Sequence, residues 1–182
     1  MPQEIRIYFE GDKSLKAGFG VFFAEIRERA LAARWEVRIV ATGGTPERDF
    51  GIALRKHPMA WNVLLRDSEG PLDPNRPASH AGSIFWMVEM MESWFHADKD
   101  ALEGYYKTGF RKDALKPNPN VEEIPKHDLI EGLKAATKDT TKGKYHKTKH
   151  APILLQSIKP ALVRKAAPIC ERIFRVVLDK LA

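Results

Sequence analysis

The stretch Trp61-Asn62-Val63-Leu64-Leu65-Arg66-Asp67-Ser68-Glu69-Gly70 decides the fold. Its apolar centre predicts a buried strand, which ends in two carboxylates and a glycine. Side chains two residues apart in a strand lie on the same side, about 6–7 Å apart, so Asp67 and Glu69 are expected to project together. Because two neighbouring carboxylates repel each other, the pair favours a bound cation. Mg²⁺ is often held by one or two carboxylates and several waters.

Two further strand patterns precede this stretch, over residues 5–9 and 35–40. Apolar residues at helical spacing predict a helix over residues 14–33 with Ser14 as its N-cap, and Thr45-Pro46 predicts the start of a helix that ends near residue 56. Strands separated by helices of this length indicate βαβ units and a mostly parallel sheet. We therefore predict an α/β, Rossmann-like fold with its site at the carboxyl ends of the strands.

The rest of the chain is predicted to be mainly helical. A polar loop is expected over residues 70–82 and a fourth buried strand over residues 83–88. Helices are then predicted over residues 89–98, 101–106, 127–137, 151–158 and 160–181. Asp98 is expected to cap the second of these helices, and Pro168 is expected to divide the last. We expect a single domain over residues 1–182, with a core of about residues 1–110 and a helical, basic C-terminal part of about residues 126–182.

Charge is distributed unevenly along the chain, whose net charge is +6. Residues 126–182 contain 13 basic and 5 acidic residues, whereas the rest contains 17 basic and 19 acidic residues. This distribution suits a metal site beside a surface that binds a polyanion. The alternative is a solvated basic face with no partner.

Several observations bear on the cellular compartment. The chain has one cysteine, Cys170, so it has no internal disulfide and no cysteine-based zinc site, and we expect a reduced thiol in the core. The N-terminal residues Met1-Pro2-Gln3-Glu4 lead directly into a strand pattern and show no signal peptide, and no apolar run approaches the ~20 residues that span a membrane. We therefore expect a cytoplasmic protein without a membrane partner.

A third carboxylate, Glu10, follows the first predicted strand and precedes Gly11. Because the carboxyl ends of parallel strands lie at one edge of a sheet, the topology can bring Glu10, Asp67 and Glu69 together. The alternative for Glu10 is a solvated residue at a strand end.

In this order, Glu10-Gly11 and Asp67-Ser68-Glu69-Gly70 resemble the motifs of the Toprim fold, the topoisomerase–primase domain. The chain looks most like the small Toprim-like proteins related to the overcoming-lysogenisation-defect nucleases of bacteria. That family has a glutamate after the first strand and a D-x-D pair after the third, so Glu69 departs from the pattern. Residues 87–98 and the tail from 144–147 through 172–174 also resemble segments of these small proteins.

The resemblance implies a nuclease that uses Mg²⁺ or Mn²⁺, held by Glu10, Asp67 and Glu69. In the related nucleases a further acidic group helps to hold a second metal, and we assign that role to Glu92, with Glu89 behind it. On a helix these two glutamates, three residues apart, would share one face. The alternative is an amphipathic helix whose glutamates are solvated.

The segment from Lys142 to His150 contains four lysines and two histidines. By resemblance, Lys147 is the catalytic lysine, which would stabilise charge on a phosphoryl oxygen. Phosphate contacts are assigned to Lys142, Lys144, Lys147 and Lys149, with Tyr145 as an aromatic among the cations. The alternative is a flexible, solvated loop. His146 and His150 have no acidic neighbour in the sequence and are not assigned to a metal.

These features lead to a leading hypothesis and two alternatives. The first is a metal-dependent endonuclease acting on DNA or RNA, which the resemblance places in anti-phage defence beside a separate ATPase subunit, since the chain has no nucleotide P-loop. The second is a non-catalytic module that binds nucleic acid or an ATPase. The third is a phosphatase or phosphotransferase acting on a small substrate. Whether the chain forms a homo-oligomer stays open at this point.

Overall fold

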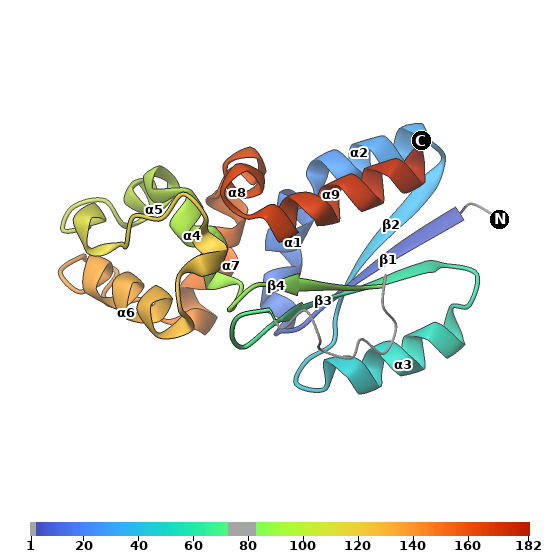
Figure 1. The fold of residues 1–182 in the computed structure, drawn as a ribbon, viewed down its shortest axis with the longest axis horizontal. Helices are drawn as coiled ribbons and strands as arrows, with labels where there is room; N and C mark the ends of the chain where they lie inside the picture. Colours follow the sequence, from blue (N-terminus) through green and yellow to red (C-terminus); the bar gives the residue numbers. More distant parts are fainter. Residues whose placement is uncertain (1–2, 73–82) are drawn as a thin grey trace.

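The computed structural model describes residues 3–72 and 83–182 and has an α/β architecture (Figure 1). Its four strands pair in the order β2-β1-β3-β4, and each neighbouring pair is parallel. They are β1 (Gln3–Phe9), β2 (Trp35–Ala41), β3 (Trp61–Asp67) and β4 (Ile84–Met87). The predicted α/β class, with a parallel sheet between helices and a helical C-terminal part, is confirmed.

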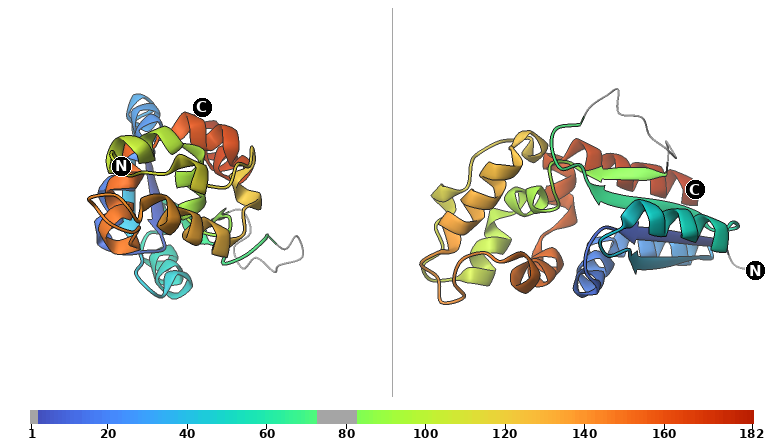
Figure 2. Two further views of the ribbon diagram at one scale, coloured as in Figure 1. Left: turned by 90° about the vertical axis from the view of Figure 1, so that its left-hand side faces the viewer. Right: turned by 90° about the horizontal axis from the view of Figure 1, so that it is seen from below.

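Helices cover both faces of the sheet (Figures 1 and 2). One face carries α1 (Lys16–Phe22), α2 (Ala24–Ala32) and α9 (Pro168–Leu181), and the other carries α3 (Pro46–Lys56). The alternation of side chains in a strand explains both layers. Ile7 and Phe9 of β1 belong to the large core under α1 and α9, whereas Tyr8 packs on Phe50 of α3, with ring centroids 5.6 Å apart.

The prediction of one helix over residues 14–33 is wrong. The segment forms a 3-10 turn, η1 (Lys13–Leu15), followed by α1 and α2, with a break at Phe23 where φ is −94° and ψ is 23°. The change of direction at Phe23 lets α1 and α2 bury Phe22, Phe23 and Ile26 in the same core. Asp12, not Ser14, is the cap, because its side chain accepts a hydrogen bond from Ser14 N at 2.8 Å.

A second lobe of short helices lies beside the sheet (Figure 1). It contains two 3-10 turns and five helices: α4 (Glu92–Ala97), α5 (Lys99–Tyr106), η2 (Lys112–Ala114), η3 (Val121–Glu123), α6 (Lys126–Thr137), α7 (Lys147–Ser157) and α8 (Pro160–Ala166). Asp98 caps α5 by accepting from Ala101 N at 3.1 Å, as predicted, and Pro168 begins α9 after the predicted division.

Two boundaries in this part differ from the predictions. The helix expected over residues 89–98 begins at Glu92, and α7 begins at Lys147 rather than near residue 151. The polar loop expected over residues 70–82 lies largely outside the described residues.

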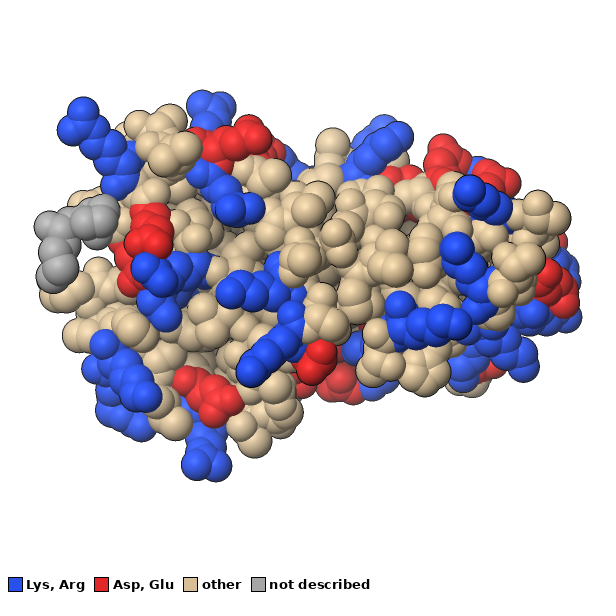
Figure 3. All heavy atoms as spheres, turned by 180° about the vertical axis from the view of Figure 1, so that it is seen from behind, with Lys and Arg blue, Asp and Glu red and all other residues tan. Residues whose placement is uncertain are grey.

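Lysine and arginine side chains are spread over both lobes on the face opposite to that of Figure 1 (Figure 3). None of the described helices is long and apolar enough to cross a membrane.

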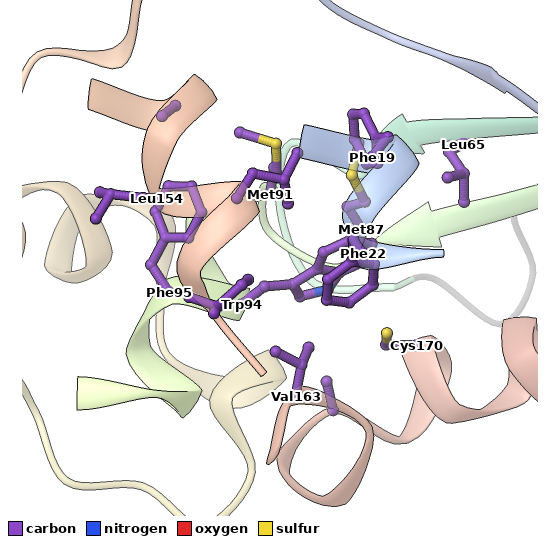
Figure 4. Close-up of a cluster of buried hydrophobic side chains, with 14 of the residues drawn as sticks. Phe19, Phe22, Leu65, Met87, Met91, Trp94, Phe95, Leu154, Val163 and Cys170 are labelled. Atoms are coloured by element: carbon purple, nitrogen blue, oxygen red, sulfur yellow. The ribbon is translucent and has the colours of Figure 1, made fainter. Parts of the chain in front are cut away.

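One continuous apolar core joins the two lobes (Figure 4). Trp94 of α4 is fully buried and stacks on Phe22 of α1, with ring centroids 4.7 Å apart and an interplanar angle of 13°. Cys170 is buried in the same core, as predicted. The helical lobe is therefore packed against the sheet lobe through large side chains, and this contact fixes the position of α4 and α7 relative to the ends of the strands.

Candidate active site

The carboxyl ends of β1 and β3 meet at the topological switch point of the sheet. After β1 the chain continues to β2 on one side, and after β3 it continues to β4 on the other. Open α/β sheets bind ligands in the crevice outside such a point. Glu10 follows β1 directly and Asp67 is the last residue of β3. The predicted placement of both carboxylates at this edge is confirmed.

Asp67 is a buried carboxylate, with 6% of the residue exposed. It continues the side of β3 that Val63 and Leu65 turn towards the large core. One oxygen, Oδ1, accepts a hydrogen bond from Met91 N at 2.8 Å, which ties the end of β3 to the segment just before α4. The other oxygen, Oδ2, is left to face the helical lobe.

Glu92, the first residue of α4, is completely buried. Its Oε1 accepts a hydrogen bond from the Tyr145 hydroxyl at 2.8 Å. Its Oε2 accepts no hydrogen bond from the described residues. A buried carboxylate oxygen without a donor is costly, so Oε2 is poised to bind a cation.

Lys147, the first residue of α7, provides the cation nearest to both acids. Its Nζ lies 3.5 Å from Asp67 Oδ2 and 3.5 Å from Glu92 Oε2, while 47% of the side chain is exposed. The three charged groups come from a strand end and two helices that lie far apart in the sequence. Because about half of the Lys147 side chain is open to solvent, the cluster is accessible to a ligand from outside.

Charge and burial shift the pKa values of this cluster. Burial raises the pKa of Asp67 to about 6, against the attraction of Lys147, and repulsion from Glu92 and Glu10 adds to the rise. Burial alone would lower the pKa of Lys147, but its attraction to Glu92 and Asp67 outweighs burial and raises it. Burial, with repulsion from Glu92, also raises the pKa of Tyr145, so Tyr145 remains a hydrogen-bond donor. At neutral pH the protonated Lys147 therefore lies beside Asp67 and Glu92.

Glu10 lies beside this cluster and is held by a different cation. Arg66 Nε lies 3.7 Å from Glu10 Oε2, and the same guanidinium pairs with Glu47 of α3 and lies over the Trp86 ring, 5.2 Å from its centroid. Glu10 Oε2 is buried and accepts no hydrogen bond among the described residues. Its repulsion adds to the rise in the pKa of Asp67, although its partner Arg66 lies on the opposite side of β3 from Asp67.

Residues 47–177, which include Asp67, Glu92 and Lys147, match the protein family described as "Domain of unknown function (DUF4276)". The chain belongs to the DUF4276 family. Comparison with curated proteins gives no match, and neither does comparison with solved structures. The DUF4276 match begins inside α3, after Glu10, so it covers the acidic strand end and the lysine-bearing helix but not the first strand.

Glu69 of the DUF4276 domain does not project beside Asp67, and that prediction is wrong. The strand ends at Asp67, and Glu69 takes a φ of 61°, which breaks the extended alternation. Its N–H donates to Glu89 O at 3.0 Å, and its carboxylate, 53% exposed, pairs with Lys126 of α6. The second acid of the site is therefore Glu92, not Glu69.

Glu89 also differs from its prediction, because it precedes α4 and shares no helix face with Glu92. Its φ is 61°, and its buried carboxylate accepts a hydrogen bond from Lys126 N at 2.9 Å. Glu89 thus anchors the start of α6, whereas Glu92 faces Lys147.

The predicted lysine segment is split between a helix start and a loop. Lys144 and Lys149 are exposed, and Lys142 Nζ lies 4.9 Å above the centroid of the Tyr105 ring. Tyr145 is not an aromatic on the surface, because it is buried beneath the segment. His150 is also buried, and its Nδ1 accepts a hydrogen bond from His146 N at 3.0 Å, which fixes the first turn of α7.

Two residues of the DUF4276 site were not identified from the sequence. Tyr145 was singled out only as an aromatic among cations, although it holds Glu92. Arg66 lies next to Asp67 in β3, but its side chain is on the opposite side of the strand. There it pairs with Glu10, a contact that was not predicted from the sequence. In both cases the partner lies too far along the chain for spacing to indicate the contact.

The donor set fits a hard cation held by two carboxylates. Among residues 3–72 and 83–182, no group of three or more His, Cys, Asp and Glu side chains could hold a metal ion by itself. Asp67 and Glu92 nevertheless turn one oxygen each towards the same point, and Glu92 Oε2 lacks a donor. Mg²⁺ is commonly bound by one or two carboxylates, with waters and substrate phosphates completing its shell. The residues present match that mode.

Proposed function

We propose that this protein is a metal-dependent nuclease that hydrolyses phosphodiester bonds at the cluster of Asp67, Glu92 and Lys147. One observation carries the proposal: two buried carboxylate oxygens, from a strand end and a helix start, lie 3.5 Å from the same partly exposed ammonium group. Carboxylates beside a lysine are the groups that phosphoryl transfer requires, because they hold a cation and neutralise charge on the phosphate.

Asp67 and Glu92 would hold Mg²⁺ or Mn²⁺, with Glu10 close enough to raise the pKa of Asp67. When bound, such a metal lowers the pKa of a coordinated water and stabilises charge on phosphoryl oxygens. Tyr145 fixes the orientation of Glu92 through its hydrogen bond to Oε1. Arg66 plays the corresponding part for Glu10 from the α3 side of the sheet.

Lys147 would release its carboxylates and donate hydrogen bonds to the scissile phosphate. As water adds to phosphorus and a P–O bond breaks, negative charge on the phosphoryl oxygens faces Nζ. The pKa of Lys147 is raised, so the group is fully protonated at neutral pH. Exposed Lys144 and Lys149, on the same segment, would contact neighbouring phosphates.

The Toprim resemblance supports the same assignment for Glu10 and Asp67. Under this proposal Glu92 takes the place that the motif gives to the second acid after the third strand. A role in anti-phage defence beside an ATPase subunit rests on the resemblance alone.

A second candidate function is a non-catalytic module that binds nucleic acid or a protein partner. The observation that favours it is the position of Lys147, whose ammonium group already lies between both carboxylates, 3.5 Å from each. In that case the cluster would be an ion-pair network that joins α7 to the ends of β3 and α4, and no metal would enter.

A cleavage assay separates the two. Supercoiled plasmid and a long RNA are incubated with the purified protein and Mg²⁺ or Mn²⁺, with EDTA as the metal-free control. We expect metal-dependent cleavage that falls at least about a hundredfold in Asp67→Asn and in Glu92→Gln, because each removes a charged ligand. Glu69→Gln is the matched control and should cleave normally, since Glu69 faces Lys126. Cleavage that persists in Asp67→Asn, or binding without any cleavage, contradicts the proposal.

A further inference from the structure

A hollow of about 720 Å³ lies between α1 and β2, the edge strand of the sheet. Its lining includes no acidic residue and no aromatic residue. It includes five cationic residues: Arg6, Lys13, Lys16, Arg27 and Arg38. On the face opposite to that of Figure 1, lysine and arginine side chains are interspersed with acidic ones (Figure 3).

Three of these cations form no ion pair with any residue of the ranges 3–72 and 83–182. Arg6 and Arg38 both pair with Glu4, at 2.8 and 2.6 Å. Within the described part of the chain, no carboxylate forms an ion pair with any of the other three: Lys13, Lys16 and Arg27. All three are exposed. Lys13 also interacts electrostatically with its neighbour Asp12, yet the five cations outnumber the acids beside them, so the hollow is complementary to a polyanion.

The hollow is related to the candidate active site through α1, which forms one wall of the hollow and packs on α7. Lys13 belongs to η1, which follows Glu10-Gly11-Asp12 at the carboxyl edge of the sheet. From there the cations follow α1, and α1 packs along α7, which begins with Lys147. The packing is close, because a Cβ on Gly18 would lie 2.8 Å from Leu155 Cβ. The hollow therefore lies on a helix next to the one that begins with Lys147.

The composition of the lining distinguishes among polyanions. Surfaces that hold single-stranded nucleic acid stack its bases on aromatic side chains, and this lining has none. Lysine and arginine without aromatics are typical of contacts to phosphates of a duplex, whose bases stay stacked on each other.

We propose that this hollow binds the phosphate backbone of a double-stranded nucleic acid, independently of sequence, next to the segment held at Asp67 and Lys147. The proposal rests on the nuclease function in assigning the substrate, but the binding itself needs no metal. Lys13, Lys16 and Arg27 would each neutralise a phosphate.

The test measures binding in EDTA by fluorescence anisotropy with a labelled duplex DNA of about 24 base pairs, over a range of salt concentrations. The test variant is Lys16→Glu/Arg27→Glu. Both positions are exposed and helical, and glutamate forms helices about as well as lysine or arginine, so folding should be retained. We expect the Kd to rise at least about tenfold and the slope of log Kd against log salt to fall by about 2, one per lost phosphate contact.

The matched control is Arg172→Glu/Lys180→Glu on α9, which reverses two exposed charges that do not line the hollow. It should bind nearly as well as the wild type. An equal loss in test and control variants overturns the proposal, because the effect would then reflect net charge alone. Tighter binding of single-stranded DNA of the same length, or displacement of the duplex by poly-glutamate at equal charge concentration, also overturns it.

The outcome is separable from that of the cleavage assay. Duplex binding through the hollow without cleavage would leave this inference standing and remove the nuclease function. If Lys16→Glu/Arg27→Glu cleaves duplex DNA as well as the wild type does, the nuclease function stands and the inference about the hollow is overturned.

Discussion

At the scale of single residues, the site depends on carboxylates that folding places where charge is unfavourable. Asp67 is nearly buried and faces Glu92, which is fully buried, and Lys147 compensates only in part. Such an arrangement costs stability in the absence of a ligand, and that cost is common where charged groups serve catalysis. Two of the residues that follow β3 and β4, Glu69 and Glu89, have a φ of 61°, which is unusual for glutamate.

The first prediction concerns the pH dependence of stability. The pKa of Asp67 is raised from 3.8 to about 6 in the folded state, so the folded protein binds this proton more tightly than the unfolded chain. The contribution of Asp67 to the free energy of unfolding therefore rises as pH falls from about 7 to about 4, by on the order of 2 kcal/mol. Urea unfolding of wild type and Asp67→Asn without metal measures it, since Asn does not titrate. A difference between the two proteins that stays constant with pH contradicts the burial of Asp67.

The second prediction concerns Tyr145. Tyr145→Phe removes the donor to Glu92 Oε1 and leaves a fully buried carboxylate less satisfied. We expect a loss of about 1–3 kcal/mol in the free energy of unfolding and a clear loss of cleavage. Tyr106→Phe is the control in the same aromatic cluster, because the buried Tyr106 hydroxyl makes no hydrogen bond within the described residues. Equal effects of the two substitutions would show that Tyr145 acts only by packing.

At the scale of helices and strands, the sequence indicates the elements better than the contacts between them. Alternation and apolar runs place all four strands, and Thr45-Pro46 and Pro168 mark helix starts. The placement of Asp67 and Glu10 at the same edge could be predicted from this pattern, because the carboxyl ends of parallel strands lie at one edge of a sheet. The partner of Glu92 could not be predicted, since Tyr145 lies 53 residues away. The turn at Glu69 was missed because glutamate gives no local signal for a positive φ.

The third prediction tests the packing of α1 on α7, which sets the distance from Lys147 to the strand ends. In Gly18→Ala the new Cβ would lie 2.8 Å from Leu155 Cβ, so the helices must separate. We expect a loss of about 1–3 kcal/mol in the free energy of unfolding. Gly51→Ala in α3 is the matched control: nothing lies within 4 Å of its Cβ, and it should gain up to about 1 kcal/mol from helix propensity. Chemical unfolding of both variants measures the contrast, and a neutral Gly18→Ala would contradict the close packing.

At the scale of the whole molecule, the two lobes are not independent units. α7 of the helical lobe packs on α1, Trp94 stacks on Phe22, and α9 returns to lie beside α2 over the sheet. The site lies where the lobes meet, with Asp67 on the sheet side and Glu92 and Lys147 on the helical side. The predicted core comprises about residues 1–110, but α7 and α9, which lie outside this range, also pack into it.

The fourth prediction follows from this arrangement. A fragment of residues 1–110 would expose the surface that α7 and α9 cover, including Phe22 and Phe23 against Phe174. We expect it to show no cooperative thermal unfolding, whereas the full chain unfolds in one transition. Circular dichroism of fragment and full chain measures this, and a cooperative transition in the fragment would show that the sheet lobe folds alone.

The central claim, that Asp67 and Glu92 together hold a catalytic metal, is tested most directly by the anomalous scattering of a crystal soaked with Mn²⁺. The account predicts a peak within about 2.0–2.6 Å of both Asp67 Oδ2 and Glu92 Oε2, with Lys147 Nζ displaced from its place between them. The same soak of Asp67→Asn should lose the peak. A wild-type crystal in which Nζ stays between the two carboxylates and Mn²⁺ is absent, or binds at Glu69 instead, would contradict the claim.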